Sequence, residues 1–234
     1  MPLKPKQLKY IYIILIIFSH TAYGQLHEYP IVQNVTDLDG KNKKSKNAEM
    51  WERNVQYLGE FKDTINLIRI SDLRAPIGDN KILITDSLSN AYPFYGNGQL
   101  KIIVDTSQIV TLQEFEWWTK KRKYQLYNAY PIFISNNSDS TTIIGYAYNI
   151  PIILEALDSD NIWKAIEVPY LYDCGLGLEY ILLKTEHLLC VLAPVYTGSF
   201  NTKLRYKLGD NYSNVFMGKI DKRQFSINER TIRK

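Results

Sequence analysis

Few side chains in this chain could act as a nucleophile, a general base or a metal ligand. The 234 residues include three histidines and two cysteines, and they contain neither a Gly-x-Ser-x-Gly elbow nor a glycine-rich phosphate loop. Cys174 and His187 are the one nucleophile and base that could act together. A histidine on a solvent-facing strand explains His187 more simply, so we expect no catalytic thiol.

Acidic residues in the C-terminal half suggest two further kinds of site. Asp158 and Asp160 could begin a calcium loop, but its sixth position is Trp163, where such a loop needs glycine. Glu155 and Glu167 could form a glycosidase pair, which needs two carboxylates roughly 5 to 10 Å apart in a cleft. Two exposed glutamates beside a hairpin loop explain the pattern more simply. We therefore expect no metal, no cofactor and no catalytic residue.

Basic and aromatic residues that could bind a partner occur in two places. Trp117 and Trp118 precede the basic run Lys120–Lys123, where rings could stack on sugars and cations could hold acidic groups. Lys203 and Arg205 belong to a cationic row on a predicted strand. The alternatives are a core tryptophan beside a solvated loop, and a charged sheet face that prevents edge-to-edge pairing. The two tryptophans and these two cations are the predicted binding residues.

The first 24 residues have the pattern of an export signal. Three lysines precede the apolar run Tyr10–Phe18, and Ala22-Tyr23-Gly24 places small residues at the two positions that a signal peptidase reads. The run is about half of the roughly 20 residues that span a bilayer, so a permanent membrane anchor is the weaker alternative. We expect export to the periplasm or the extracellular space, with no transmembrane anchor after cleavage.

The charge balance argues against one class of partner. The formal net charge is +4, but the signal carries three of the 28 basic residues and none of the 24 acidic ones, so the mature chain is nearly neutral. A nucleic-acid-binding protein normally has a strongly basic surface, and an exported protein does not meet nucleic acid. We expect the partner to be an envelope protein or a surface glycan, and not a nucleic acid.

Composition and spacing favour an all-β fold. Val, Ile, Thr, Tyr, Phe and Trp gather in short runs that turn residues separate. Segment 111–127 fits either a short helix, because Leu112, Phe115 and Trp118 recur at helical spacing, or an alternating strand. We predict a signal peptide at 1–24, a flexible polar lead-in at 25–56, a β-rich region at 57–127, a β-sandwich at 128–228 and a basic tail at 229–234.

The C-terminal half contains the clearest strands. Alternating side chains predict one strand over Thr142–Ile150 and another over Phe200–Leu208, the second with a buried face and a cationic face. Asp158–Asn161 predicts a hairpin loop. Val215–Ile220 and Gln224–Ile227 are candidates for closing strands.

The two cysteines could pair in an oxidising compartment. If Leu178–Leu183 and Leu188–Leu192 form a hairpin, however, Cys190 lies opposite Ile181, and Cys174 is roughly 23 Å further along at strand spacing. We therefore predict two free thiols, with Cys190 buried. A disulfide remains the alternative if the two strands belong to different sheets.

A series of short motifs runs through residues 130–225. It consists of Tyr130–Ser138, Glu155–Asp158, Trp163–Glu167, Cys174-Gly175, Tyr196–Arg205, Ser213-Asn214 with Phe216 and Gly218, and Gln224-Phe225. In this order the motifs resemble a family of uncharacterised exported proteins from Gram-negative bacteria. The resemblance implies an immunoglobulin-like β-sandwich in the C-terminal half and no particular reaction.

Together these observations predict an exported, non-catalytic binding or structural module of the cell envelope. The alternatives are an envelope enzyme, either a glycan hydrolase or a thiol-dependent activity, and an inhibitor of an exported protease. An enzyme would bring Cys174 or the carboxylates into one cleft with other titratable groups.

We predict that the purified mature protein begins at Gln25, because Ala22-Tyr23-Gly24 provides the cleavage site. N-terminal sequencing of the exported protein tests this expectation. Recovery of the first 24 residues in a membrane fraction would show that the segment is an anchor.

Overall fold

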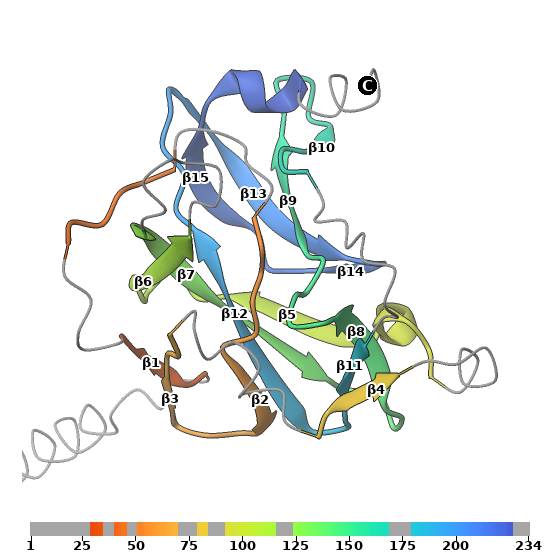
Figure 1. Cartoon of the computed structure of the whole chain (residues 1–234). Coiled ribbons are helices and arrows are strands. Elements are labelled where there is room, and N and C mark those ends of the chain that lie inside the picture. The colour runs from red at the N-terminus through yellow and green to blue at the C-terminus, as the bar shows by residue number, and fades with distance from the viewer. Residues whose placement is uncertain are drawn as a thin grey trace, which may run out of the picture. The chain divides into compact units, whose positions relative to one another are not determined.

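The computed structural model describes residues 29–34, 40–45, 51–69, 79–83, 92–115, 124–168 and 179–226. The predicted signal peptide, Trp117, Trp118 and Cys174 lie outside these ranges. Residues from Ile31 onward form one compact unit, which contains the strands of Figure 1. No helix in the described ranges is long and apolar enough to cross a membrane.

The first large sheet is built around a long central strand, β7 (Tyr124–Asn136). The apolar run at Tyr130–Ile134 lies within β7, and Ile132, Phe133 and Ile134 are buried. All pairings in this sheet are antiparallel, with β12 on one side of β7 and both β5 and β6 on the other. The other strands are β2 (Tyr57–Glu60), β5 (Leu100–Val104), β6 (Val110–Phe115) and β12 (His187–Pro194).

The second large sheet is built around β13 (Phe200–Leu208). Thr202, Leu204, Tyr206 and Leu208 are buried, as the strict alternation of the sequence predicts. β9 lies along one edge of β13, and β14 and β15 follow one another along the other edge. The remaining strands are β9 (Ile153–Leu157), β10 (Trp163–Ala165), β14 (Asn211–Tyr212) and β15 (Phe216–Ile220).

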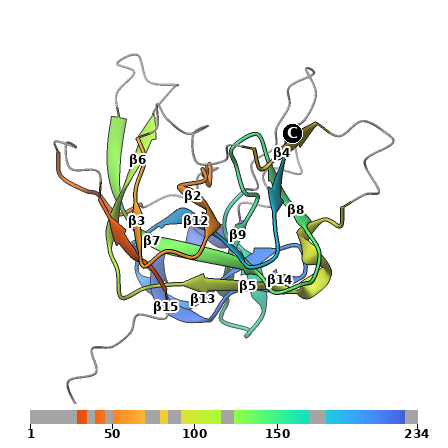
Figure 2. The ribbon, with the colours of Figure 1, turned by 90° about the horizontal axis from the view of Figure 1, so that it is seen from below.

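Two smaller sheets complete the described strands. β11 (Glu179–Leu183) pairs with β4 (Lys81–Leu83) and β8 (Thr142–Tyr146), and Figure 2 shows β4 and β8 on the side opposite β6. β1 (Ile31–Gln33) and β3 (Thr64–Asn66) form a parallel pair. The described ranges also contain two short 3-10 helices, η2 (Tyr95–Gly98) between β4 and β5 and η3 (Lys222–Ser226) after β15.

Asparagine side chains join the two large sheets where β5 meets β14. The amide of Asn214 accepts a hydrogen bond from the N–H of Val104 (2.7 Å) and donates one to its carbonyl oxygen (3.1 Å). Asn211 accepts from the N–H of Leu100 at 2.9 Å. Tyr130 of β7 also contacts Phe216 of β15 edge-to-face, with ring centres 6.1 Å apart. These contacts hold the two sheets as one packed β structure.

The all-β prediction is confirmed, and the open question at 111–127 is answered over its first part. Val110–Phe115 is strand β6, which pairs with β7, so the helical alternative is wrong there. The predicted boundary at residue 128 falls inside β7, and strands from both sides of it share one sheet. The two predicted β regions therefore belong to one folded unit.

Other strands are shorter than the sequence pattern predicts. The strand expected over Thr142–Ile150 ends at Tyr146, because Ala147 takes a φ of 54° and Tyr146 and Asn149 exchange backbone hydrogen bonds across a tight turn. The closing strand expected at Gln224 is instead η3. The hairpin loop at Asp158–Asn161 is confirmed, since Asp158 bonds the backbone at both ends of the loop.

The predicted hairpin between residues 178–183 and 188–192 is wrong. β11 pairs with β4 and β8, whereas β12 pairs with β2 and β7, so the two strands belong to different sheets. The distance argument against a disulfide therefore loses its basis. Cys190 is nevertheless a buried free cysteine, as predicted.

Candidate binding site

The predicted cationic row lies on the outward face of β13. Lys203 is exposed and makes no ion pair with another residue in the described part of the chain. Arg205 is more enclosed, because its guanidinium lies over the rings of Trp163 (4.3 Å) and Tyr212 (4.1 Å) and its Nε donates to Glu155 at 2.8 Å. Of the two predicted residues, Lys203 is thus the more available to a partner.

The same outward face contains more cations than carboxylates. Asn201 and Lys203 of β13 pair with Lys219 and Met217 of β15, so the four side chains share one face. Among the outward positions of β9, β13 and β15, the charged residues are Glu155, Lys203, Arg205, Lys207 and Lys219. Four cations and one carboxylate make this face attractive to an acidic partner.

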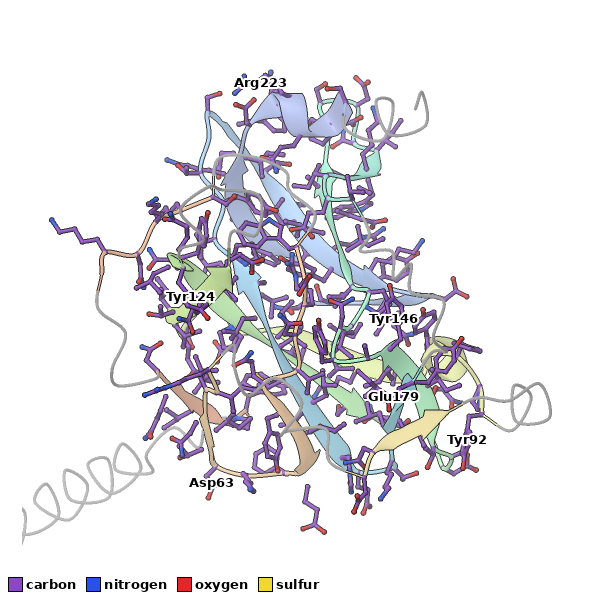
Figure 3. The ribbon with its side chains drawn as sticks, viewed as in Figure 1. Asp63, Tyr92, Tyr124, Tyr146, Glu179 and Arg223 are labelled. Atoms are coloured by element: carbon purple, nitrogen blue, oxygen red, sulfur yellow. The ribbon has the colours of Figure 1, made fainter. Side chains whose placement is uncertain are left out.

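The other predicted binding residues, Trp117 and Trp118, fall outside the described ranges. Their segment follows β6 and precedes β7. Tyr124, which Figure 3 labels, pairs with Phe115 at the end of this hairpin. The cationic row on β13 belongs to a different sheet from β6 and β7, the strands between which segment 116–123 lies in the sequence.

A buried ion pair that the sequence analysis missed lies behind the inner face of β13. Arg53 and Glu167 are 1% and 2% exposed, and Arg53 Nη2 donates to Glu167 Oε1 at 2.7 Å. The same oxygen accepts from the Tyr196 hydroxyl at 2.6 Å, and Oε2 accepts from the N–H of Leu154 at 3.1 Å. Both oxygens of Glu167 are therefore engaged, and the prediction of an exposed glutamate at this position is wrong.

Burial and the charge of Glu167 shift the pKa values of Arg53 and of the two tyrosines beside the ion pair. Burial raises the pKa of the Tyr196 hydroxyl well above its ordinary value, and the charge of Glu167 raises it further. The pKa of Tyr206 is raised for the same two reasons. Burial lowers the pKa of Arg53, but Glu167 and the two tyrosines outweigh this effect and raise it overall. Arg53 therefore stays protonated, and both tyrosines stay neutral, across the physiological pH range.

Tyr196 and Tyr206 also line a partly open cavity of about 250 Å³. Its other aromatic walls are Tyr130 and Phe216, and the Phe216 ring stacks against Tyr206 with centres 6.3 Å apart. The cavity is thus enclosed by β7, β13 and β15 together with the connection between β12 and β13. β13 and β15 run side by side in Figure 1 and Figure 2.

Two lysines lie at this cavity. Lys44 and Lys219 are exposed residues of the lining, and the described residues that line the cavity include no carboxylate. Lys44 is placed by its neighbour Ser45, whose N–H donates to the Val195 carbonyl and whose carbonyl accepts from the N–H of Thr197. The short segment 43–45 therefore borders the cavity on the side of the β12–β13 connection.

The β12–β13 connection approaches the end of β15 closely at Gly198. A Cβ atom there would lie 2.1 Å from the backbone carbonyl of Ile220, so no residue other than glycine fits without a backbone shift. Gly198 belongs to the motif Tyr196–Arg205, and this contact gives that motif a structural reason.

The candidate catalytic groups in the described residues do not converge. Glu155 meets Arg205 on the outward face of the sheet, whereas Glu167 reaches Arg53 in the interior, so the two carboxylates lie on opposite faces. Cys174, the thiol considered for catalysis, lies outside the described residues. Burial raises the pKa of the other thiol, Cys190, which disfavours a reactive thiolate there. Asp158 is occupied by its hairpin loop and by Lys164, 2.6 Å away.

Sequence reasoning found the outward face but neither the cavity nor the buried pair. Glu167 carried a weak signal, because it ends the motif Trp163–Glu167. Arg53 carried none, since it lies in a polar stretch interpreted as a flexible lead-in. Trp51, Arg53 and Val55 are in fact buried, and Ile31–Gln33 forms strand β1, so that interpretation is wrong for residues 31–33 and 51–56.

The chain matches no protein-family model, no curated protein and no solved structure.

Removing the charge of Glu167 should strongly destabilise the fold. Glu167→Gln leaves the buried guanidinium of Arg53 without a counter-ion, which typically costs about 3 to 5 kcal/mol. Glu155→Gln is the matched control, because it breaks a more exposed pair with Arg205 and should cost about 1 kcal/mol or less. Urea unfolding of both variants measures the difference, and equal midpoints would show that the buried pair has no special role.

Proposed function

We propose that this chain is an exported, non-catalytic binding module of the cell envelope whose partner carries acidic groups. The observation that carries the proposal is the outward face of β9, β13 and β15, with Lys203, Arg205, Lys207 and Lys219 against Glu155. Met217 lies among these cations and is 58% exposed, so the face also offers apolar contact. Such a surface attracts an acidic partner from a distance and can exclude water from the contact.

The engagement of the titratable groups supports binding over catalysis. Both carboxylates considered for catalysis have a structural partner, since Glu155 pairs with Arg205 and Glu167 pairs with Arg53. Asp158, considered for a calcium loop, pairs with Lys164. A general acid or base must instead face a substrate with a tuned pKa.

Export and the immunoglobulin-like relationship rest on the sequence patterns. The first 24 residues support export, and the ordered motifs over residues 130–225 support an immunoglobulin-like sandwich. The two antiparallel five-stranded sheets are compatible with that architecture. An envelope protein and a surface glycan both supply carboxylates, which is the chemistry that the cationic face selects.

Two acidic probes, polyglutamate and polygalacturonate, test the proposal. We expect at least one probe to bind the mature protein at low salt. Its affinity should fall as the salt concentration rises, because salt screens exposed charges. Lys203→Glu should weaken binding on the order of tenfold, since it replaces an attraction by a repulsion. Fluorescence anisotropy with labelled probes measures the affinity.

The matched control is Lys184→Glu, which reverses an exposed charge in the turn between β11 and β12. It should leave the affinity almost unchanged. If neither probe binds at low salt, or if both charge reversals have the same effect, the cationic face is not the binding surface.

A further inference from the structure

One edge of β15 has no partner among the described strands. The strand pairs with β13 on one side, and no described strand pairs with its other side. An edge of this kind presents backbone N–H and C=O groups that another extended chain can pair with. Proteins use such edges to bind peptides, where main-chain hydrogen bonds provide affinity and side-chain pockets provide specificity.

The aromatic cavity borders this edge. Phe216, Met217, Gly218 and Lys219 of β15 all belong to its lining. Roughly 150 Å³ is enough for a cavity to bind benzene, so the cavity of about 250 Å³ has room for one apolar or aromatic side chain. The walls of Tyr130, Tyr206 and Phe216 are suited to such a group.

The charges around the edge of β15 indicate which side chains the partner should carry. Lys44 and Lys219 line the cavity, and Lys203 lies opposite Met217 on the neighbouring strand. Because side chains alternate along a strand, a chain added to β15 would direct one set toward the cavity and the other toward the outward lysines. The first set should contain an apolar residue, and the second set should contain Asp or Glu.

We propose that β15 binds an extended acidic polypeptide segment as an additional strand, with one apolar side chain of that segment in the cavity. This inference rests on the proposed function and narrows the acidic partner to a protein. A glycan carries carboxylates, but it lacks the regular N–H and C=O groups that pair with a strand edge.

The test uses a labelled synthetic peptide that alternates Glu and Thr around a central Phe. We expect it to bind the mature protein, and replacing Phe by Gly should weaken binding about tenfold or more, because the cavity is then left unfilled. Two further peptides carry N-methyl groups on alternate residues, one peptide for each edge of the strand. Only one of the two should lose binding, since only one edge faces β15.

Two protein variants test whether the peptide binds at the cavity. Asn201 is exposed and shares the outward face with Lys203, yet it also belongs to the lining of the partly open cavity, so it lies at the rim. Asn201→Trp should narrow this opening and weaken peptide binding about tenfold. Asn137→Trp is the matched control, because Asn137 is also exposed but follows β7 and is not part of the lining. Urea unfolding of both variants confirms that they are folded before their affinities are compared.

The outcomes separate this inference from the proposed function. Binding of polygalacturonate that depends on Lys203, with no peptide binding, would overturn the added strand and leave the acidic-partner proposal intact. The added strand would also be overturned if both N-methylated peptides lost binding equally, or if neither peptide lost binding. Failure of every acidic probe would overturn both proposals.

Discussion

The arrangement of this protein depends on the buried ion pair between Arg53 and Glu167. The backbone of Arg53 is also fixed, because its N–H donates to Asn149 Oδ1 at 2.6 Å and its carbonyl accepts from the N–H of Ile150 at 3.0 Å. Glu167 binds the N–H of Leu154, beyond the last pairing of β9 with β10. The ion pair and the hydrogen bonds of its two residues thus connect the segment before β2, the turn after β8 and the second large sheet. Burying two charges costs free energy, so the ion pair contributes mainly by fixing the positions of these three segments.

The surface features depend on the same interior. The Tyr196 hydroxyl donates a hydrogen bond to Glu167. The guanidinium carbon of Arg53 lies over the ring of Tyr206, 5.7 Å from the ring centre. Both tyrosines form walls of the cavity, and β13 carries Tyr206 inward and Lys203 outward. A change in the buried pair should therefore move the cavity wall, whereas a change in the outward lysines should leave the fold intact.

Local patterns predicted much of the fold, because they report on single strands. Alternation identified β13 with both of its faces, and the polar run at Asp158 identified its hairpin. Long-range pairing has no such local signature. β11 and β12 are neighbours in sequence and look like a hairpin, yet they join different sheets. For the same reason Arg53 appeared to belong to a polar lead-in, since its partner is 114 residues away. The cationic part of the site was predictable, and the cavity was not.

A double-mutant cycle on the buried pair is the most direct test of this account. Arg53→Met and Glu167→Leu each remove one charge, and urea unfolding gives the free energy for both single variants and for the double variant. We expect each single change to cost about 3 to 5 kcal/mol, and the double variant to be no less stable than either single one, because no buried charge is left unpaired. Additive losses in the double variant would show that the two side chains act independently, and would contradict the account.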